Sequence, residues 1–205
     1  MIHRILQKEL ERAYGRRKVI TILGPRQVGK STLLSELATA GTRVRVLNCD
    51  NEDDRRLLID KTSTELRNLV EPHDFFMIDE AQRVKNIGLT LKKIGDLHLD
   101  SHVIVTGSSS FDLADEINEP ATGRLLEYHL FPLSLPELAA ATSQVEERRV
   151  LETRMIFGLY PEVVTQPEYA RDTLMNLVNN CLYRDALAYQ GMRKPDALMK
   201  LVRAL

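Results

Sequence analysis

The sequence has no long apolar run, few cysteines and almost no net charge. No stretch of its 205 residues approaches the roughly 20 consecutive apolar residues of a membrane-spanning helix. The amphipathic start, MIHRILQKEL, carries no cleavage site, so we infer no signal peptide. The two cysteines, Cys49 and Cys181, lie far apart, and no cysteine–histidine spacing suggests zinc. These absences predict a cytoplasmic protein with reduced thiols and no membrane partner.

The charge is small in total but uneven along the chain. The net charge of −1 argues against a general nucleic-acid binder. Residues 1–30 carry eight Lys or Arg and two Glu, whereas residues 50–80 carry ten Asp or Glu and four Lys or Arg. The basic start either contacts nucleic acid or an acidic partner, or it forms a solvated helix face. We favour the solvated face, because most charge runs are of that kind.

Apolar residues make up 43% of the chain and alternate between strand-like and helical patterns, enough for one α/β domain. A helical pattern precedes Gly15. Strand-like runs follow at 18–23, 44–49, 75–78 and 103–106, with a fifth candidate at 125–131. Helix signals occupy 31–40, 62–71 and 86–97, and the second opens on a capping box at Thr62. The alternation predicts βαβ crossovers and a parallel sheet.

Beyond Pro132 and Pro136 the pattern becomes wholly helical. We expect one helix over residues 137–157 and another over 171–187. The chain shows no internal repeat and no low-complexity tract.

Residues 24–32 read GPRQVGKST and follow a predicted strand. Two glycines five residues apart, then a lysine and a hydroxyl, form the P-loop pattern, and the strand before and helix after it supply the required context. The glycines let backbone N–H groups turn toward phosphate oxygens, at the positive end of the helix that begins here. Lys30 is expected to reach the β- and γ-phosphates, and the Ser31 hydroxyl to ligate Mg²⁺.

The whole loop is therefore expected to contact ATP or ADP. The predicted nucleotide-binding residues are Gly24, Pro25, Arg26, Gln27, Val28, Gly29, Lys30, Ser31 and Thr32. Arg26 and Gln27 occupy variable positions whose side chains can point away from the phosphates. Arg26 is either solvated or in contact with another subunit or the nucleotide.

A second nucleotide signature lies 49 positions after Lys30, where an apolar strand ends in Asp79-Glu80. Ligands of open α/β sheets bind at the carboxyl ends of the strands. Asp79 is expected to hold Mg²⁺, directly or through water, and Glu80 to orient the attacking water. The alternative is a cap for a helix that starts at this strand end. Pairing with the P-loop favours the functional interpretation.

A glutamate directly after the metal aspartate favours ATPases with an extra strand between the loop strand and the acid strand. The 103–106 run would then lie between the other two strands. Thr106 or Ser108 would reach the γ-phosphate or the attacking water as a polar sensor, with Ser109 a third choice. The alternative is that residues 106–110 form only a polar turn.

Several stretches together resemble a known family. They are RKVITILGPRQVGKSTLL, FFMIDEAQRV, VIVTGSSSFDL, TGRLLEYHLFPLSLPEL and GLYPEVV, in this order. The chain resembles, over almost its whole length, the bacterial and archaeal AAA-type ATPases whose ATPase domain precedes a domain of unknown function. The resemblance implies an α/β P-loop NTPase with an additional-strand, AAA+-like core followed by a small helical lid. It also implies ATP at residues 24–32, Mg²⁺ at Ser31 and Asp79, and water activation at Glu80.

Other features of the family fall on Arg124 and the end of the chain. Arg124 stands in the family's Thr-Gly-Arg, where it would sense the γ-phosphate in its own subunit or a neighbour, or serve as a structural ion-pair residue. Residues 158–162 match Gly-x-x-Pro-Glu, with Leu159 where a second glycine is usual. The expected divisions are a core over 1–133, a lid over 134–194, and the start of a truncated winged helix over 195–205.

Two functions remain open. The first is an ATPase that hydrolyses ATP with Mg²⁺ to change shape, with low turnover of the isolated chain. The second is a nucleotide-gated switch or scaffold that holds ATP or ADP with little turnover. A small-molecule kinase fits less well, because Glu80 suits the activation of water. Nucleotide is the expected ligand and a homo-oligomer is an open partner, whereas a client and nucleic acid are not determined.

Overall fold

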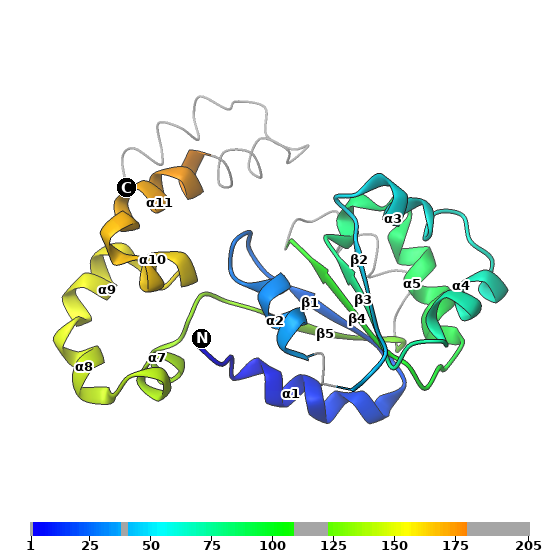
Figure 1. Cartoon of the computed structure of the whole chain (residues 1–205), viewed down its shortest axis with the longest axis horizontal. Coiled ribbons are helices and arrows are strands. Elements are labelled where there is room, and N and C mark those ends of the chain that lie inside the picture. Colours follow the sequence, from blue (N-terminus) through cyan, green and yellow to red (C-terminus); the bar gives the residue numbers. More distant parts are fainter. Residues whose placement is uncertain (1, 38–40, 109–122, 180–205) are drawn as a thin grey trace.

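A five-stranded parallel sheet forms the centre of the computed structural model, which describes residues 2–37, 41–108 and 123–179 (Figure 1). The strands are β1 (Val19–Leu23), β2 (Val44–Asn48), β3 (Phe75–Asp79), β4 (His102–Gly107) and β5 (Leu125–His129). Their order across the sheet is β2-β3-β4-β1-β5, and every pair is parallel. Strand β4 therefore lies between the loop strand and the acid strand, which confirms the additional-strand α/β prediction.

Helices cover both faces of the sheet. On one face lie α1 (Leu6–Ala13), which continues into η1 (Tyr14–Arg16), and α2 (Lys30–Leu37); on the other lie α3 (Glu52–Arg56), α4 (Ser63–Val70) and α5 (Ile87–Asp96) (Figure 1). Alternate strand residues enter two separate cores. Ile20 and Ile22 pack with α1 and α2, whereas Val19 and Leu23 pack with α4 and α5. The sheet is thus buried on both sides, as parallel sheets generally are.

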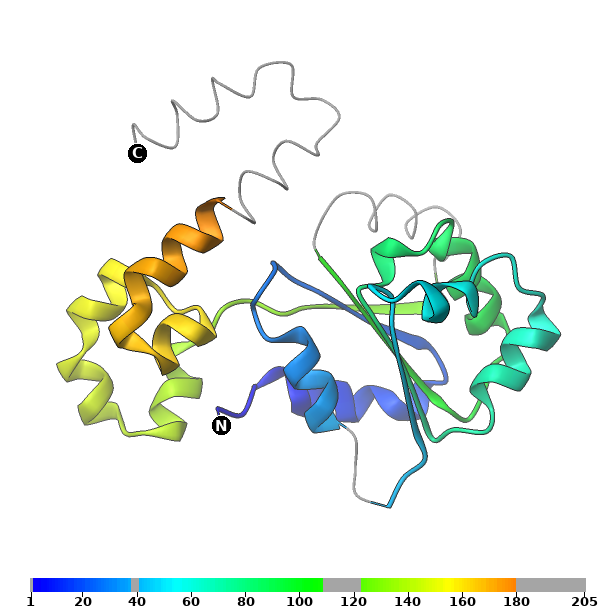
Figure 2. The same cartoon turned by 45° about the horizontal axis from the view of Figure 1, so that its top comes forward.

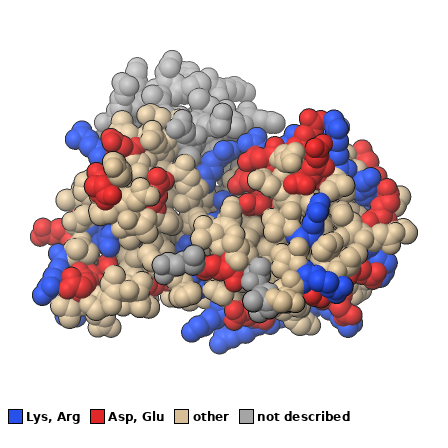
Figure 3. Space-filling model, in the orientation of Figure 1, with Lys and Arg blue, Asp and Glu red and all other residues tan. Residues whose placement is uncertain are grey.

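Local capping signals explain where two of these helices begin. The Thr62 side chain accepts a hydrogen bond from the Glu65 N–H while Glu65 reaches back to the Thr62 N–H, which confirms the predicted capping box of α4. Helix α3 has no counterpart in the predicted pattern, because its five residues bury no side chain and so show no apolar spacing. Asn51 caps it, and acidic side chains gather over this part of the surface (Figure 3).

Beyond β5 the chain forms a separate group of short helices beside the sheet (Figure 2). These are α7 (Leu135–Ala141), α8 (Gln144–Arg149), α9 (Leu151–Phe157), α10 (Pro161–Thr165), η3 (Pro167–Tyr169) and α11 (Ala170–Leu177). The prediction of one helix over 137–157 is wrong. Ser143 takes an extended backbone and caps a new helix by accepting the Glu146 N–H, and the chain breaks again at Val150.

Some predictions fall outside the described residues. They are the sensor choice Ser109, the second cysteine Cys181, the later part of the 171–187 helix, and the winged-helix start over 195–205. Among the helices that the structure does describe, none has the length and apolar character needed to cross a membrane.

Candidate functional site

The phosphate loop joins the carboxyl end of β1 to the start of α2, and both of its glycines are required by geometry. A Cβ atom on Gly24 would collide with the Leu130 carbonyl oxygen, so any larger residue would displace the backbone. Gly29 has a φ of +97°, which side chains rarely adopt. Gln27 also has a positive φ, and it is exposed at the crown of the loop. The fold thus sets a tight turn at this position.

Lys30 is the first residue of α2 and is only 4% exposed. Its Nζ atom donates to the carbonyl oxygens of Gly24 and Pro25, each at 2.9 Å. The ammonium group therefore folds back from the first residue of α2 and bonds the opening residues of the loop. This position places a buried positive charge within the phosphate loop.

Asp79 collects two hydroxyl groups at the carboxyl end of β3. The Ser31 hydroxyl donates to Asp79 Oδ2 at 2.6 Å, and the Thr106 hydroxyl of β4 donates to Oδ1. Asp79 is 8% exposed and Thr106 is fully buried. The structure thus brings together three of the predicted residues from α2, β3 and β4.

Glu80 follows Asp79 in a left-handed conformation with φ of +54°. Its backbone N–H donates to Asp79 Oδ1 and Thr106 Oγ1, and its Oε2 accepts a hydrogen bond from Gln82 Nε2. Gln82, in η2 (Ala81–Arg83), in turn accepts the Ser108 N–H at 3.4 Å. The Gln82 side chain therefore bridges the Ser108 backbone N–H and the Glu80 carboxylate. Glu80 stands at the N-cap position of η2, as the helix-cap alternative expects, but its side chain makes no capping hydrogen bond there.

Arg124 lies at the amino ends of the strands, whereas the phosphate loop lies at their carboxyl ends. It immediately precedes β5, whose first residue pairs with Val19 at the start of β1, and its carbonyl accepts the Val19 N–H. Four residues of extended strand, about 13 Å, separate that edge from the loop end of β1. Its side chain forms an ion pair with Asp96 of α5. Arg124 thus makes an ion pair of the kind that the structural alternative expects, and a role in sensing the γ-phosphate stays a proposal.

A cavity of about 260 Å³ adjoins the phosphate loop. It is lined by Ile2, Arg4, Gly29, Thr32, Leu33, Glu36, Leu133, Pro161 and Thr165. The segment before α1, the start of α2, the β5–α7 connection and α10 all contribute to it. The sequence did not predict that residues outside the loop line a cavity, because these residues meet only when distant segments fold together. The sole sequence signal among them is the Pro-Glu of residues 161–162, which belongs to the family motif.

The oxygen ligands at the carboxyl edge fit a hard divalent cation. A serine hydroxyl and a carboxylate 2.6 Å apart are the ligand types that Mg²⁺ prefers. Within the described ranges, no group of three or more His, Cys, Asp or Glu side chains could hold a metal by itself. Phosphate oxygens and water would have to complete the coordination, as is usual for Mg²⁺ bound with a nucleotide.

Comparison with known proteins agrees with this geometry. A family model described as AAA domain matches residues 16–139. A protein of Haemophilus influenzae is 22% identical over 201 residues, covering 88% of this chain and 49% of its own. A protein of Methanocaldococcus jannaschii is also 22% identical, covering 93% of this chain and 46% of its own. The chain spans about half the length of these curated relatives.

Solved structures share the fold at low sequence identity. A Walker-type ATPase of Pyrococcus abyssi aligns over all of this chain and 76% of its own, with 15% identity and a TM-score of 0.54. A signal transduction ATPase with a tetratricopeptide repeat sensor from Pyrococcus horikoshii aligns over 78% of this chain and 28% of its own, with 10% identity and a TM-score of 0.51. The chain therefore belongs to the AAA-domain family, and its fold is that of the P-loop ATPases.

Proposed function

We propose that this chain binds ATP or ADP with Mg²⁺ at residues 24–32 and hydrolyses ATP to drive a conformational change. The observation that carries the proposal is the 2.6 Å hydrogen bond between Ser31 and Asp79, at the residue that follows the buried, loop-bonded Lys30. A phosphate cradle, a cation-binding pair and a buried positive charge converge at one edge of the sheet. That edge is where open α/β sheets bind ligands.

The loop residues would hold the phosphates. Backbone N–H groups of the loop and the start of α2 supply donors, and Lys30 would exchange its two loop carbonyls for phosphate oxygens. Bound Mg²⁺ supplies positive charge that offsets charge on the transferred phosphoryl group. Ser31 and Asp79 are the residues that would hold it.

Glu80 would orient the attacking water. Its carboxylate is held by Gln82, which also accepts the Ser108 N–H, so the base is linked to the end of β4. Thr106 contacts Asp79 and would fix the metal-binding carboxylate; a sensor role for Thr106 or Ser108 remains part of the proposal. General-base catalysis of this kind contributes about 10²- to 10⁴-fold to the rate.

The cavity beside the loop would receive the base and ribose. Its volume of about 260 Å³ and its lining by Leu33, Leu133 and Pro161 suit a flat, partly apolar group. Pro161 and Thr165 belong to α10, so nucleotide in this cavity would contact the helical region as well as the core. We propose that residues 134–194 act as a lid over a core of residues 1–133, and that this contact transmits the nucleotide state.

The second candidate function is a switch that holds ATP or ADP with little turnover. The hydrogen bonds of Lys30 within the loop and of Ser31 to Asp79 assemble the residues that would bind nucleotide. The Glu80 carboxylate, in contrast, is engaged by Gln82, and this contact favours binding with little turnover. A homo-oligomer could supply Arg124 from a neighbouring subunit, since that residue lies away from its own loop.

Phosphate release and nucleotide binding, measured on wild type and Glu80→Gln, test the proposal. We expect Glu80→Gln to bind ATP as wild type does and to lose about 10²-fold or more of the turnover. Glu71→Gln is the matched control, because among the described residues the Glu71 carboxylate pairs only with Arg67, at the surface. Wild-type turnover in Glu80→Gln would exclude Glu80 as the base. Tight binding with no phosphate release by wild type, at any protein concentration, would favour the switch.

A further inference from the structure

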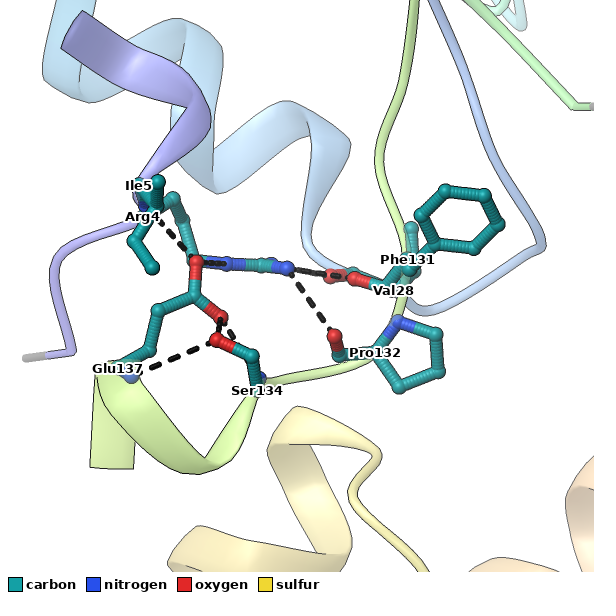
Figure 4. A network of polar contacts seen from close by, with 7 residues as sticks. All are labelled: Arg4, Ile5, Val28, Phe131, Pro132, Ser134 and Glu137. Carbon is teal, nitrogen blue, oxygen red and sulfur yellow. Dashed lines mark hydrogen bonds and ion pairs between the residues drawn. The ribbon is translucent and has the colours of Figure 1, made fainter. Parts of the chain in front are cut away.

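Arg4 is a buried arginine that joins three distant parts of the chain (Figure 4). It precedes α1 and is 9% exposed. Its Nη1 atom donates to the Val28 carbonyl of the phosphate loop at 3.0 Å, and its Nη2 atom donates to the carbonyls of Phe131 and Pro132 after β5. Its Nε atom donates to Glu137 Oε1 of α7 at 3.1 Å. One guanidinium thus connects the loop to the start of the helical region.

The contact with Val28 bears on the orientation of the loop backbone. A trans peptide is planar, with its C=O and the following N–H pointing in opposite directions. Because Arg4 binds the Val28 carbonyl, the Gly29 N–H points away from Arg4. Gly29 is the second glycine of the phosphate pattern, where backbone N–H groups serve as phosphate donors. At φ of +97° this residue has few steric restraints of its own, so an external contact can fix its peptide.

Glu137 holds Arg4 in place from the other side. Its Oε1 also accepts the Ile5 N–H at 2.8 Å, and its Oε2 accepts the Ser134 N–H at 2.7 Å within the capping box of α7. Burial alone would raise the pKa of Glu137, but the N–H groups of Ser134 and Ile5 and the charge of Arg4 outweigh it and hold the pKa below its ordinary value. The carboxylate therefore stays ionised and fully bonded.

The Arg4–Glu137 ion pair is buried, and Arg4 has several further acceptors besides Glu137. A guanidinium presents several donors in a rigid fork, and here the fork reaches one carboxylate and three backbone carbonyls at once. Lysine could keep the charge but could not reach all of these acceptors. The same Arg4 side chain also lines the cavity beside the loop. These features connect its position to the ligand as well as to the fold.

We propose that Arg4 is a positioning residue for the phosphate loop, held in place by Glu137, so that nucleotide binding and the start of the helical region depend on one buried ion pair. The proposal rests on the nucleotide binding proposed above. A purely structural pair would stabilise the folded chain without changing the affinity of the folded loop for phosphates.

The test uses the full chain with Arg4→Lys and Glu137→Gln, titrated with ADP and Mg²⁺ by calorimetry, together with the Tm of each variant without ligand. Arg4→Lys keeps the charge and Glu137→Gln keeps the shape, so both are chosen to preserve folding. We expect each to lower ADP affinity by about tenfold, the worth of one well-placed hydrogen bond to a charged group.

Two controls separate positioning from stability. Leu10→Ala removes a fully buried side chain of α1 and should lower the Tm while the folded protein binds ADP as wild type does. Arg43→Lys alters an exposed ion pair with Asp74, between segments 31 residues apart, and should change neither quantity.

The outcomes are distinguishable. Wild-type ADP affinity in both Arg4→Lys and Glu137→Gln, with or without a lowered Tm, would overturn the positioning role and leave the proposed function standing. An equal loss of affinity in Leu10→Ala would also overturn it, because any destabilisation would then have the same effect. Absence of ADP binding by wild type would refute the proposed function, and this proposal with it.

Discussion

The Ser31 hydroxyl donates a 2.6 Å hydrogen bond to Asp79 Oδ2, although the two residues lie 48 positions apart. Ser31 belongs to the first turn of α2, and Asp79 is the last residue of β3. Strand β4 lies between β3 and β1, the strand that leads into the loop. The additional strand, β4, supplies Thr106, whose hydroxyl donates to the second carboxylate oxygen of Asp79. Contacts within the chain thus orient both the hydroxyl and the carboxylate.

Ser31→Ala is expected to remove the dependence of ATP affinity on Mg²⁺, because the cation would lose one of its two protein oxygen ligands. Affinity measured with Mg²⁺ and with a chelator should then differ little, whereas in wild type the two should differ clearly. Ser35→Ala is the matched control, since Ser35 lies one turn further along α2 and, within the described part of the chain, its hydroxyl bonds the Ser31 carbonyl alone. An Mg²⁺ effect in Ser31→Ala as large as in wild type would count against this cation site.

Gln82→Ala is expected to lower ATP turnover by about tenfold and leave nucleotide affinity unchanged. Gln82 joins the Glu80 carboxylate to the Ser108 N–H, so its loss would free the base to adopt other orientations. Gln7→Ala, which removes a similar Gln–Glu pair on the exposed face of α1, is the control. Unchanged turnover in Gln82→Ala would show that Glu80 is positioned by other groups.

Arg124→Ala is expected to leave nucleotide affinity and single-chain turnover unchanged, with a loss of stability of up to about 1 kcal/mol, because its visible role is a half-exposed ion pair with Asp96. Asp96→Asn should cause a similar loss. Chemical denaturation and phosphate release at low protein concentration check both points. A fall in turnover that appears only at high concentration would reveal a role in a neighbouring subunit.

Cys49 is expected to resist thiol reagents in the folded protein near pH 8. Burial, followed by the negative charges of Asp54 and Asp79, raises the pKa of its thiol from 9.0 to about 12. The stability linked to this group is therefore complete below pH 9 and is lost as pH rises toward 12. Labelling of Cys181→Ser with and without denaturant measures it; rapid labelling of the native protein would contradict this environment.

The sequence predicts the parts of the site that depend on local pattern. The loop at 24–32 and the acid pair after β3 each carry a strand, a turn and defined residue types in one continuous stretch. The position of β4 between β1 and β3 followed from Glu80, because that residue favours one class of P-loop fold. These predictions needed no knowledge of which distant residues meet.

Other features depend on contacts that no local pattern shows. Arg4 and Glu137 lie 133 positions apart, and each looks like an ordinary charged residue in its own segment. Arg124 follows a family motif, yet parallel pairing of β5 places it at the amino edge of the sheet. The break at Ser143 was hidden because helix-forming residues on both sides continue the apolar spacing.

The most direct test of the account is calorimetric titration of the full chain with ATP and Mg²⁺, for wild type and Lys30→Ala. Lys30 is buried and bonded within the loop, so its loss should weaken ATP binding by about 10- to 100-fold. Lys8→Ala, on the exposed face of α1, should bind as wild type does. Equal affinity of wild type and Lys30→Ala, or no binding by wild type, would contradict nucleotide binding at residues 24–32.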